Sequence, residues 1–259
     1  MHFGLIGGTG LDEMDCFANG HRQKISSRFG DADVIEAEYG GHSIVFVPRH
    51  GFDHSAPPGS INYRAQIAAL RVIGVDAVLG VCAVGSLKSD LLPGSFVVLS
   101  DFIDLTKRRV DTFFDAATGP VVHTDFSEPY CAHVSASLIQ GCKNASGYYK
   151  TKGVYIGVEG PRYESPAEVR LYASWGADVI GMTNVPEVIL AKEAGLCYGA
   201  VAIVTNLATG ISDDNLSHDE VRAEMAKSMS RLQSVLLTAV NSIPHLRQCS
   251  CRSNRGLII

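Results

Sequence analysis

The sequence predicts an α/β fold: a single domain with a central mixed, largely parallel β-sheet flanked by helices. Short apolar runs of strand length alternate along the chain with longer segments of helical periodicity, which is typical of a sheet covered by helices on both faces. The 259 residues contain no repeat, linker or low-complexity stretch. One domain over residues 1–245, followed by a C-terminal tail over 246–259, accounts for this pattern.

The first half of the chain is expected to open with a strand and a hairpin. Residues 1–6 form an apolar run that ends at two glycines, and residues 33–38 and 43–47 flank the turn pair Gly40-Gly41. Apolar positions at helical spacing predict a helix over 62–73. Two buried strands are expected next, at 77–84 and 96–99.

In the second half of the chain, predicted strands and helices continue to alternate. Pro166 suits the first turn of a helix, and Gly195 suits the end of one. The tail after Pro244 is polar and basic, and we expect it to be mobile. The elements predicted here are helix 127–142, strand 153–158, helix 166–174, strand 179–182, helix 186–194, strand 198–205 and helix 217–243.

Composition and charge exclude several classes of protein. Apolar residues make up 46% of the chain and charged residues 19%, an ordinary globular balance that argues against disorder. The net charge of -5 gives no reason to expect nucleic acid or an anionic membrane as a partner. No apolar run reaches 18 residues, and the N-terminal segment lacks the features of a signal peptide. We therefore expect a cytoplasmic protein.

The cysteines and histidines show no metal-ligand spacing. Seven cysteines are an odd number, which argues against a secreted disulfide framework, and no C-x-x-C pair occurs. The nine histidines contain no H-E-x-x-H pattern, so no metal site is expected. Cys249 and Cys251 form a C-x-C near the C-terminus. Two free thiols on a tail are the simpler interpretation, and a disulfide is the alternative.

Ligands of such folds bind beyond the carboxyl ends of the strands, and a glycine-rich turn follows the first predicted strand. In Gly7-Gly8-Thr9-Gly10, backbone N–H groups could approach an anion and the Thr9 hydroxyl could donate to it. The turn is not a dinucleotide fingerprint, because Glu13 stands where the third glycine would be. A plain strand-to-helix turn is the alternative.

Arg49 and His50 follow another apolar strand. A guanidinium fork suits phosphate oxygens, and His50 can add a donor; a surface arginine beside a histidine is the alternative. Thr183 follows the strand at 179–182 and would supply a neutral donor. These residues would bind phosphate only if the fold brings them together.

A second group of residues suits a heteroaromatic ring. Tyr163 offers a stacking face beside the Glu164 carboxylate, and the Asn206 amide offers both a donor and an acceptor. The alternatives are a first-turn acid for Glu164 and a turn residue for Asn206. Met182 would more often be core, and His218 an exposed residue beside a Ser217–Glu220 capping box.

Taken together, these segments resemble the trimeric nucleoside phosphorylase superfamily, which includes the purine nucleoside and methylthioadenosine phosphorylases. The resemblance covers about residues 4–243 and implies the nucleoside phosphorylase fold. The matching stretches include Ile6-Gly7-Gly8-Thr9-Gly10-Leu11, Pro48-Arg49-His50-Gly51, Ala83-Val84-Gly85-Ser86-Leu87, Glu159-Gly160-Pro161-Arg162-Tyr163 and Gly181-Met182-Thr183-Asn184-Val185-Pro186-Glu187.

The resemblance implies phosphorolysis of a purine nucleoside to free purine and ribose 1-phosphate, a glycosyl transfer of purine salvage. Phosphate is the co-substrate, and no metal or other cofactor is implied. The family positions for phosphate are Thr9, Arg49, His50, Cys82, Ala83 and Thr183, with Cys82 standing where relatives carry Thr or Asn. The positions for the nucleoside are Tyr163, Glu164, Met182, Asn206, Ala208 and His218, with His123 near a loop that a neighbouring subunit contributes.

The same positions bear on the choice of substrate. The methylthioadenosine branch carries Asp-x-Asp where this chain has Asn206-Leu207-Ala208, whereas the 6-oxopurine branch pairs a Glu with an Asn, here Glu164 and Asn206. We expect Glu164, Asn206 and His50 to carry catalysis, and inosine and guanosine to be the substrates. The alternatives are S-methyl-5′-thioinosine or S-methyl-5′-thioadenosine, or a nucleoside-binding protein without turnover. The resemblance also implies a homotrimer or a hexamer of trimers.

Overall fold

The computed structural model describes residues 1–8, 10–114, 122–212, 218–245 and 248–254. Its β-strands are β1 His2–Gly7, β2 His21–Ser27, β3 Gly30–Tyr39, β4 His42–Pro48, β5 Ala77–Ser86, β6 Phe96–Leu105, β7 Tyr149–Val158, β8 Val179–Gly181 and β9 Cys197–Leu207. Its α-helices are α1 Tyr63–Ile73, α2 Ala132–Asn144, α3 Pro166–Ser174, α4 Asn184–Glu193 and α5 His218–Ser242. Short 3-10 helices are η1 Asp15–Phe17, η2 Pro58–Ser60 and η3 Ser250–Asn254.

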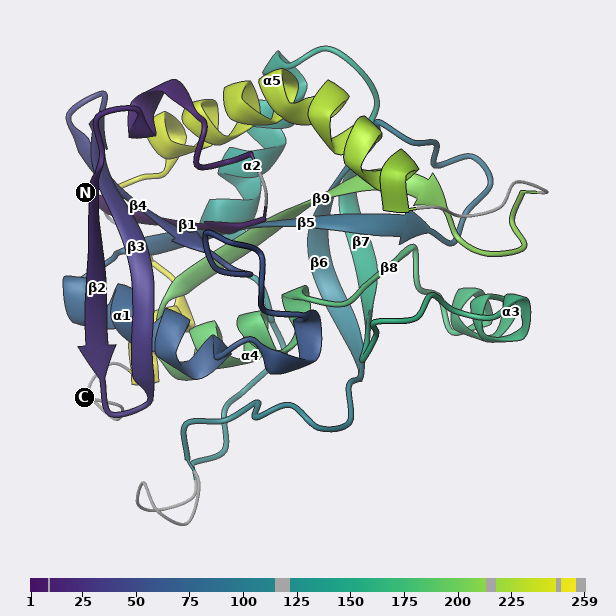
Figure 1. Ribbon diagram of the computed structural model, residues 1–259, viewed down its shortest axis with the longest axis horizontal. Helices are drawn as coiled ribbons and strands as arrows, with labels where there is room; N and C mark the ends of the chain where they lie inside the picture. Colours follow the sequence, from purple (N-terminus) through teal and green to yellow (C-terminus); the bar gives the residue numbers. More distant parts are fainter. Residues whose placement is uncertain (9, 115–121, 213–217, 246–247, 255–259) are drawn as a thin grey trace.

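The strands form one sheet that partly closes on itself. Their order is β2-β3-β4-β1-β5-β8-β7-β6-β9, and β9 also pairs with β5. Strands β5, β8, β7, β6 and β9 therefore make a closed ring, and β1 to β4 extend from it as an open sheet (Figure 1). The pairs β1–β4, β1–β5 and β5–β9 are parallel, whereas β5–β8 and β6–β9 are antiparallel. The predicted mixed sheet is confirmed.

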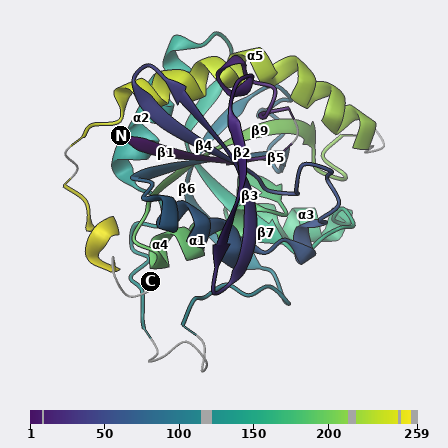
Figure 2. The ribbon, with the colours of Figure 1, turned by 60° about the vertical axis from the view of Figure 1, so that its left-hand side comes forward.

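Helices cover the sheet on two faces, each over its own apolar cluster. One face carries α1 and α4, which contribute Ile67, Leu70 and Val188 to the core. The opposite face carries α2 and α5, which contribute Leu138 and Leu236 (Figures 1 and 2). The short helix α3 lies apart from both layers and packs on the ring side of the sheet through a third cluster.

Three elements differ from the sequence expectations, each for a local reason. The edge strand β2 was not expected, because its side chains are mostly exposed and lack an apolar alternation. Helix α2 begins at Ala132 rather than at 127. Pro129 disfavours helix before it, and the Cys131 N–H is committed to the Tyr198 carbonyl at 2.7 Å. Strand β6 continues to Leu105, well beyond its apolar run.

The C-terminal segment packs against the domain. Within the described residues it forms the helix η3, whose Cys251 side chain is buried in the same apolar cluster as α2 and α5. Arg252 also pairs with Asp76, with 2.9 Å between nitrogen and oxygen. Cys249 and Cys251 form no disulfide, as the simpler interpretation expected, but the segment that carries them packs against the domain, so the expectation of a mobile tail is wrong. In the described part of the chain, no helix is long and apolar enough to cross a membrane.

Candidate active site

The candidate site lies over the carboxyl ends of the central strands. Ala83 is exposed, although it belongs to the central strand β5 and both neighbours, Cys82 and Val84, are buried. An exposed side chain in the middle of a helix-covered sheet marks an opening in that cover. The glycine loop after β1 and the turn after β4 border this region, because Gly7 pairs with Pro48 in the sheet.

The sheet brings the glycine loop and the Arg49-His50 pair together. The Arg49 N–H donates to the Gly7 carbonyl at 2.9 Å, and a small pocket is lined by residues of both segments, including Gly8 and His50. The hydroxyl donor predicted at Thr9 falls on a position outside the described residues. The fold thus brings these two segments together, which the sequence alone could not show.

Arg49 forms a buried ion pair with Glu187, a residue to which the sequence interpretation gave no role. Nε lies 2.7 Å from Glu187 Oε2, and Nη2 lies 3.0 Å from Oε1. Further bonds run to the carbonyls of Val81 and Ile6, so the described residues occupy four of the five guanidinium N–H groups. Burial alone would lower the pKa of Arg49, but the charge and hydrogen bonds of Glu187 raise it.

This finding changes the expected role of the Arg49 fork. A bidentate grip on phosphate needs two parallel N–H groups on one edge of the guanidinium, and Glu187 occupies such an edge. Arg49 can therefore act on an anion through its charge and one remaining N–H group. Its side chain is 2% exposed, so water screens that charge little, although the Glu187 carboxylate beside it balances most of it.

A chain of hydrogen bonds extends from Glu187 across the core. The Tyr198 hydroxyl donates to Glu187 Oε1 at 2.6 Å and accepts from Asn184 Nδ2 at 2.7 Å. Asn184 Oδ1 accepts in turn from the Tyr130 hydroxyl at 2.5 Å. All of these groups are buried, and each bond fixes the position of the next group.

The same chain reaches the turn that carries Thr183. The Tyr155 hydroxyl accepts from the backbone N–H groups of Thr183 and Asn184, at 3.1 and 3.3 Å. Asn184 thereby belongs both to the Arg49 network and to the Thr183 turn. Two of the predicted phosphate residues, Arg49 and Thr183, are connected through one rigid set of bonds.

His50 is half-buried, and its ring orientation is fixed by one bond. Nδ1 lies 2.9 Å from the Ala56 carbonyl, which can only accept, so Nδ1 carries the hydrogen. Burial lowers the pKa of His50, and the nearby Arg49 charge lowers it further. A neutral ring then presents Nε2 as an acceptor.

Cys82 and Ala83 are the two phosphate positions on β5. The Cys82 side chain is buried in the core cluster under α1 and α4, and burial raises the pKa of its thiol to about 12. The thiol is therefore neutral and a weak donor. Successive residues of a strand point to opposite faces, which is why Ala83 is exposed where Cys82 is buried.

Met182 and the loop after β7 are held together by Arg109, a second residue that the sequence interpretation missed. Arg109 donates to the carbonyls of Met182 and Val185 on one side and of Val158 and Glu159 on the other. Gly160 packs against the Met182 side chain with no room for a Cβ, at a φ of +69°. No motif marked Arg109, since its role depends only on tertiary contacts.

Glu164 precedes α3, and its carboxyl is buried. A capping box between Ser165 and Glu168 fixes the start of that helix, and Arg162 pairs with Glu168. Burial raises the pKa of Glu164 above its ordinary value. Its neighbour Tyr163 is 38% exposed and free to offer a ring face.

Asn206 and Ala208 lie at the end of β9 beside that helix start. Asn206 pairs with Gly85 of β5, and its amide bonds locally to the Thr205 hydroxyl and the Leu207 carbonyl. Two residues past Ala208, Gly210 packs against Pro166 of α3. The C-terminal end of β9 and the start of α3 are therefore neighbours, as a shared base-binding region requires.

Besides Thr9, two predicted positions are not placed in the site. His123 is exposed on the loop before α2, with no hydrogen bond to another predicted site residue among the contacts of the described residues. His218 is the first residue of α5, and its side chain and the capping residue Ser217 lie outside the described part.

Comparison with known proteins agrees with this geometry. The family model of the phosphorylase superfamily matches residues 2–241. A probable 6-oxopurine nucleoside phosphorylase of Moorella thermoacetica is 43% identical and covers 100% of this chain and 99% of its own length. An S-methyl-5′-thioadenosine phosphorylase of Thermofilum pendens is 41% identical, covering 96% and 94%.

Solved structures of related enzymes share this fold. The methylthioadenosine phosphorylase of Schistosoma mansoni, solved with adenine, superimposes with a TM-score of 0.91 at 32% identity, covering 100% of this chain and 97% of the other. A glycine loop, an Arg-His pair and a polar strand end meet here on a fold that these enzymes share. The chain belongs to the phosphorylase superfamily, and it is a nucleoside phosphorylase, an enzyme of pentosyl transfer.

Proposed function

We propose that this enzyme cleaves 6-oxopurine nucleosides, inosine and guanosine, with phosphate, giving the free purine and ribose 1-phosphate. The observation that carries the proposal is that Glu164 stands just before α3 while Asn206 and Ala208 lie at the end of the strand that neighbours the start of that helix. Hypoxanthine and guanine carry a hydrogen on N1, whereas adenine does not. A buried carboxylate at 164 suits an N1–H donor, and it would face the bare N1 lone pair of adenine unfavourably.

Asn206 supplies the rest of the base recognition. Its amide can donate to N7 or O6 of the purine, and a hydrogen bond at N7 stabilises the negative charge that the leaving base gains. The bonds of Asn206 to Thr205 and Leu207 hold this amide at the end of β9. An aspartate at 206 would accept the 6-amino hydrogens of adenine instead.

Phosphate would lie at the carboxyl ends of β1, β4 and β5. Arg49 contributes its buried charge, His50 and Thr183 contribute side chains, and the backbone at Ala83 contributes an N–H group. The transition state resembles an oxocarbenium ion, so a positioned phosphate both stabilises the cation and becomes the nucleophile. Thr9 would add its hydroxyl from the glycine loop.

His50 has a defined protonation in this scheme. Since Nδ1 donates to Ala56, a neutral His50 would accept a hydrogen bond at Nε2 from a phosphate O–H group. That bond would hold the phosphate proton on one oxygen and leave another oxygen free to attack the anomeric carbon. His50 would thus orient the nucleophile.

His218 bears on the 5′ end of the nucleoside. A histidine at this position suits a 5′-hydroxyl better than a methylthio group, which favours inosine over S-methyl-5′-thioinosine. The relative from Thermofilum pendens is named for a methylthio nucleoside, so the methylthio nucleosides are the second candidate substrates.

A rate assay separates the candidates. Inosine, guanosine, adenosine, S-methyl-5′-thioinosine and S-methyl-5′-thioadenosine are each incubated with and without phosphate, and base release is followed. Phosphate-dependent release of hypoxanthine and guanine, with adenine nucleosides inert, is the expected result. Release of adenine would overturn the assignment of Glu164 and Asn206. Asn206→Asp should shift the ratio toward adenosine, and an unchanged ratio would contradict the role of Asn206.

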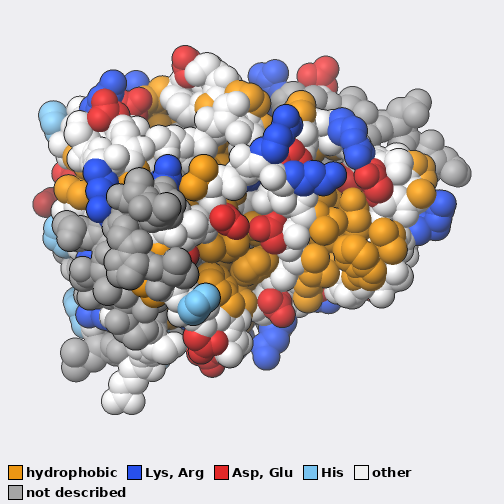
Figure 3. Space-filling model, turned by 90° about the horizontal axis from the view of Figure 1, so that it is seen from below, with side chains coloured by type: hydrophobic (Ala, Val, Ile, Leu, Met, Phe, Trp, Pro, Cys, Tyr) orange, Lys and Arg blue, Asp and Glu red, His pale blue; other side chains and the backbone are white. Residues whose placement is uncertain are grey.

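We also propose that the chain works as a homotrimer in which a neighbouring subunit, through the loop of His123, completes the site. Apolar side chains gather over the right-hand half of the face in Figure 3, the side on which Figure 1 places α3. Leu171 of α3 and Trp175, the C-cap of that helix, are 46% and 50% exposed. Exposed apolar groups that gather in this way mark an interface.

Light scattering after size exclusion tests this assembly. Trp175→Glu should lower the mass from three chains to one and lower the rate. Val72→Glu changes an equally exposed apolar residue on α1 and serves as the control. A wild-type mass of one chain would contradict the trimer.

A further inference from the structure

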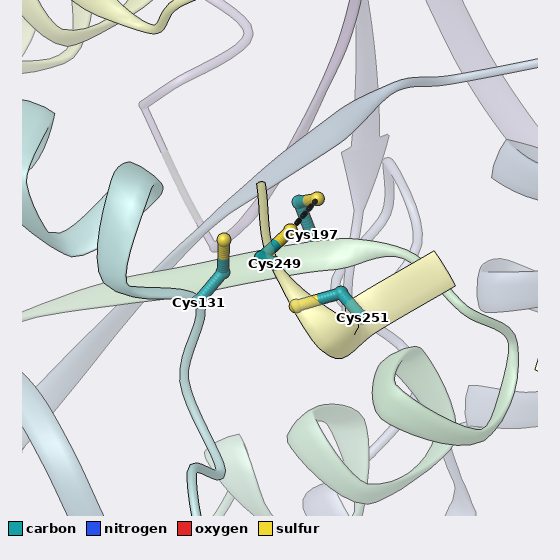
Figure 4. A group of neighbouring side chains, drawn as sticks. All are labelled: Cys131, Cys197, Cys249 and Cys251. Carbon is teal, nitrogen blue, oxygen red and sulfur yellow. Dashed lines mark hydrogen bonds between the residues drawn. The ribbon is translucent and has the colours of Figure 1, made fainter. Parts of the chain in front are cut away.

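Four of the seven cysteines meet at one point, although they come from three distant parts of the chain. Cys131 precedes α2, Cys197 opens β9, and Cys249 and Cys251 belong to the C-terminal segment. Their sulfur atoms all lie within 4.8 Å of one another. Figure 4 shows the four side chains close together, although they come from these separate elements.

The spacing of the sulfurs is that of metal ligands and not of disulfides. A disulfide places its sulfurs about 2.05 Å apart, and none of the four cysteines forms a disulfide. Cys197 Sγ and Cys249 Sγ lie 3.6 Å apart. Four sulfurs held tetrahedrally at about 2.3 Å from a zinc ion would lie about 3.8 Å from one another. We propose that these four cysteines bind one structural Zn²⁺ ion.

The surroundings of the cluster suit a closed zinc site. Cys131, Cys197 and Cys251 are buried and Cys249 is half-buried, all within the apolar cluster beneath α2 and α5. Four thiolates fill the tetrahedral coordination of zinc and leave no position for water or substrate, which is the arrangement of a structural site. Soft sulfur ligands favour zinc over magnesium or calcium.

Binding has a simple balance of charge and protons. Four thiols release four protons, and the four thiolates with Zn²⁺ carry a net charge of −2. Cys131 occupies the N-cap position of α2, so the unpaired N–H groups of the first helical turn lie on that side of the cluster. This end of the helix dipole partly offsets the negative charge.

The ion would fasten the C-terminal segment to the domain and stiffen the path to the active site. Cys197 is followed directly by Tyr198, whose hydroxyl holds Glu187. The Cys131 N–H bonds to the Tyr198 carbonyl. Two of the four ligands thus support the strand end from which Tyr198 reaches the Arg49 network.

Metal content and spectroscopy test the proposal on the full-length protein. The chain is purified with a reductant and without chelator, and zinc is measured by elemental analysis. We expect one zinc ion per chain. After exchange with Co²⁺, the thiolate-to-metal charge-transfer bands and strong visible bands of a tetrahedral sulfur site should appear.

Single substitutions identify the ligands. Cys249→Ser changes the least buried ligand and should lose most of the zinc while the chain still folds. Cys131→Ser should do the same. Cys142→Ser changes a fully buried cysteine of the same apolar cluster that is not among the four, so it is the control and should keep its zinc. Loss of zinc should lower the melting temperature by roughly 5 °C or more.

Three outcomes would overturn the site. An intact mass four hydrogens below the reduced chain, with no zinc, would show two disulfides in its place. Four thiols that react freely in the folded protein, again with no zinc, would show a reduced cluster without a ligand. Unchanged zinc content in both Cys131→Ser and Cys249→Ser would place the metal elsewhere.

Discussion

At the scale of single residues, the Arg49–Glu187 ion pair is the contact on which the proposed phosphate-binding part of the site depends most. Removing the charge of Glu187 leaves the buried guanidinium without its partner, a change that costs about 3 to 5 kcal/mol in other proteins. We expect Glu187→Gln to lower the free energy of unfolding by about that amount and to raise the KM for phosphate. Denaturant unfolding and phosphate kinetics measure the two effects.

A matched control lies on the same helix. Glu193 of α4 is also buried, but its carboxylate accepts from the Thr112 hydroxyl and the Phe113 N–H rather than from a cation. Glu193→Gln should lower stability without changing the KM for phosphate. An equal rise in KM for both variants would show that Glu187 acts only through general stability.

Glu164 predicts a pH dependence. The ionised carboxylate accepts N1–H more strongly than the protonated carboxyl does, and burial raises the pKa of this carboxyl. The kcat/KM for inosine should therefore be full at pH values well above the raised pKa and fall as pH decreases through it, at a pH above 4.5. Glu164→Gln should lower kcat/KM for inosine by about a hundredfold, since a charged acceptor is lost, and should abolish this acid limb.

A substrate without the N1 hydrogen isolates this effect. 1-Methylinosine offers no N1–H donor, so the wild-type enzyme and Glu164→Gln should differ little with it. An acid limb that survives in the variant with inosine would assign the titration to another group.

The residue scale also shows where prediction from the sequence stops. Glycines beside a Thr, an Arg-His pair and a Glu before a helix are recognisable because their chemistry is local. Glu187 and Arg109 are not, because the arginine that Glu187 pairs with and the carbonyls that Arg109 holds lie more than 40 residues away in the sequence. The burial of Arg49 likewise depends on residues from other elements, which the local sequence does not reveal. Its guanidinium was therefore expected to be free for phosphate, whereas Glu187 occupies one edge of it.

At the scale of elements, apolar periodicity predicted the strands and helices of the interior and failed at the edge. The interior strands β5 and β9 have long buried runs, whereas β2, at the border of the sheet, contributes only Ile25 to the apolar clusters of the described residues. The start of α2 was misplaced because a single proline and one backbone bond to β9 outweigh helical periodicity over residues 127–131.

The packing of α2 against α5 gives a prediction at this scale. A Cβ on Gly141 of α2 would lie 2.4 Å from the Val235 carbonyl oxygen of α5, closer than any side chain can approach. Alanine favours a helix over glycine by about 1 kcal/mol, but forcing the two helices apart costs about 1 to 3 kcal/mol. Gly141→Ala should therefore destabilise the protein in denaturant unfolding.

Ala136→Gly tests the propensity alone, because Ala136 is exposed on the same helix. It should cost about 1 kcal/mol. If Gly141→Ala instead raised stability, the two helices would have room to separate without loss of packing.

At the scale of the whole molecule, two features could not be predicted from local patterns. The ring β5-β8-β7-β6-β9 closes because β9 pairs with both β6 and β5, and no periodicity within one strand indicates its second neighbour. The cysteine cluster joins positions 131, 197, 249 and 251, whose spacing resembles no metal motif. Both features arise only once the chain has folded.

The C-terminal segment gives a final prediction for the molecule as a whole. The sheet, the five α-helices of the described residues and the residues assigned to the active site all lie within 1–245, so a chain ending at 245 should fold and keep a kcat near that of the full chain. It would lose Cys249 and Cys251, and with them the zinc and the cover over Cys131 and Cys197. Its melting temperature should fall at least as far as that of Cys249→Ser. A truncated chain that fails to fold would show instead that the last 14 residues are part of the domain's core, because the apolar cluster beneath α2 and α5 cannot close without Cys251.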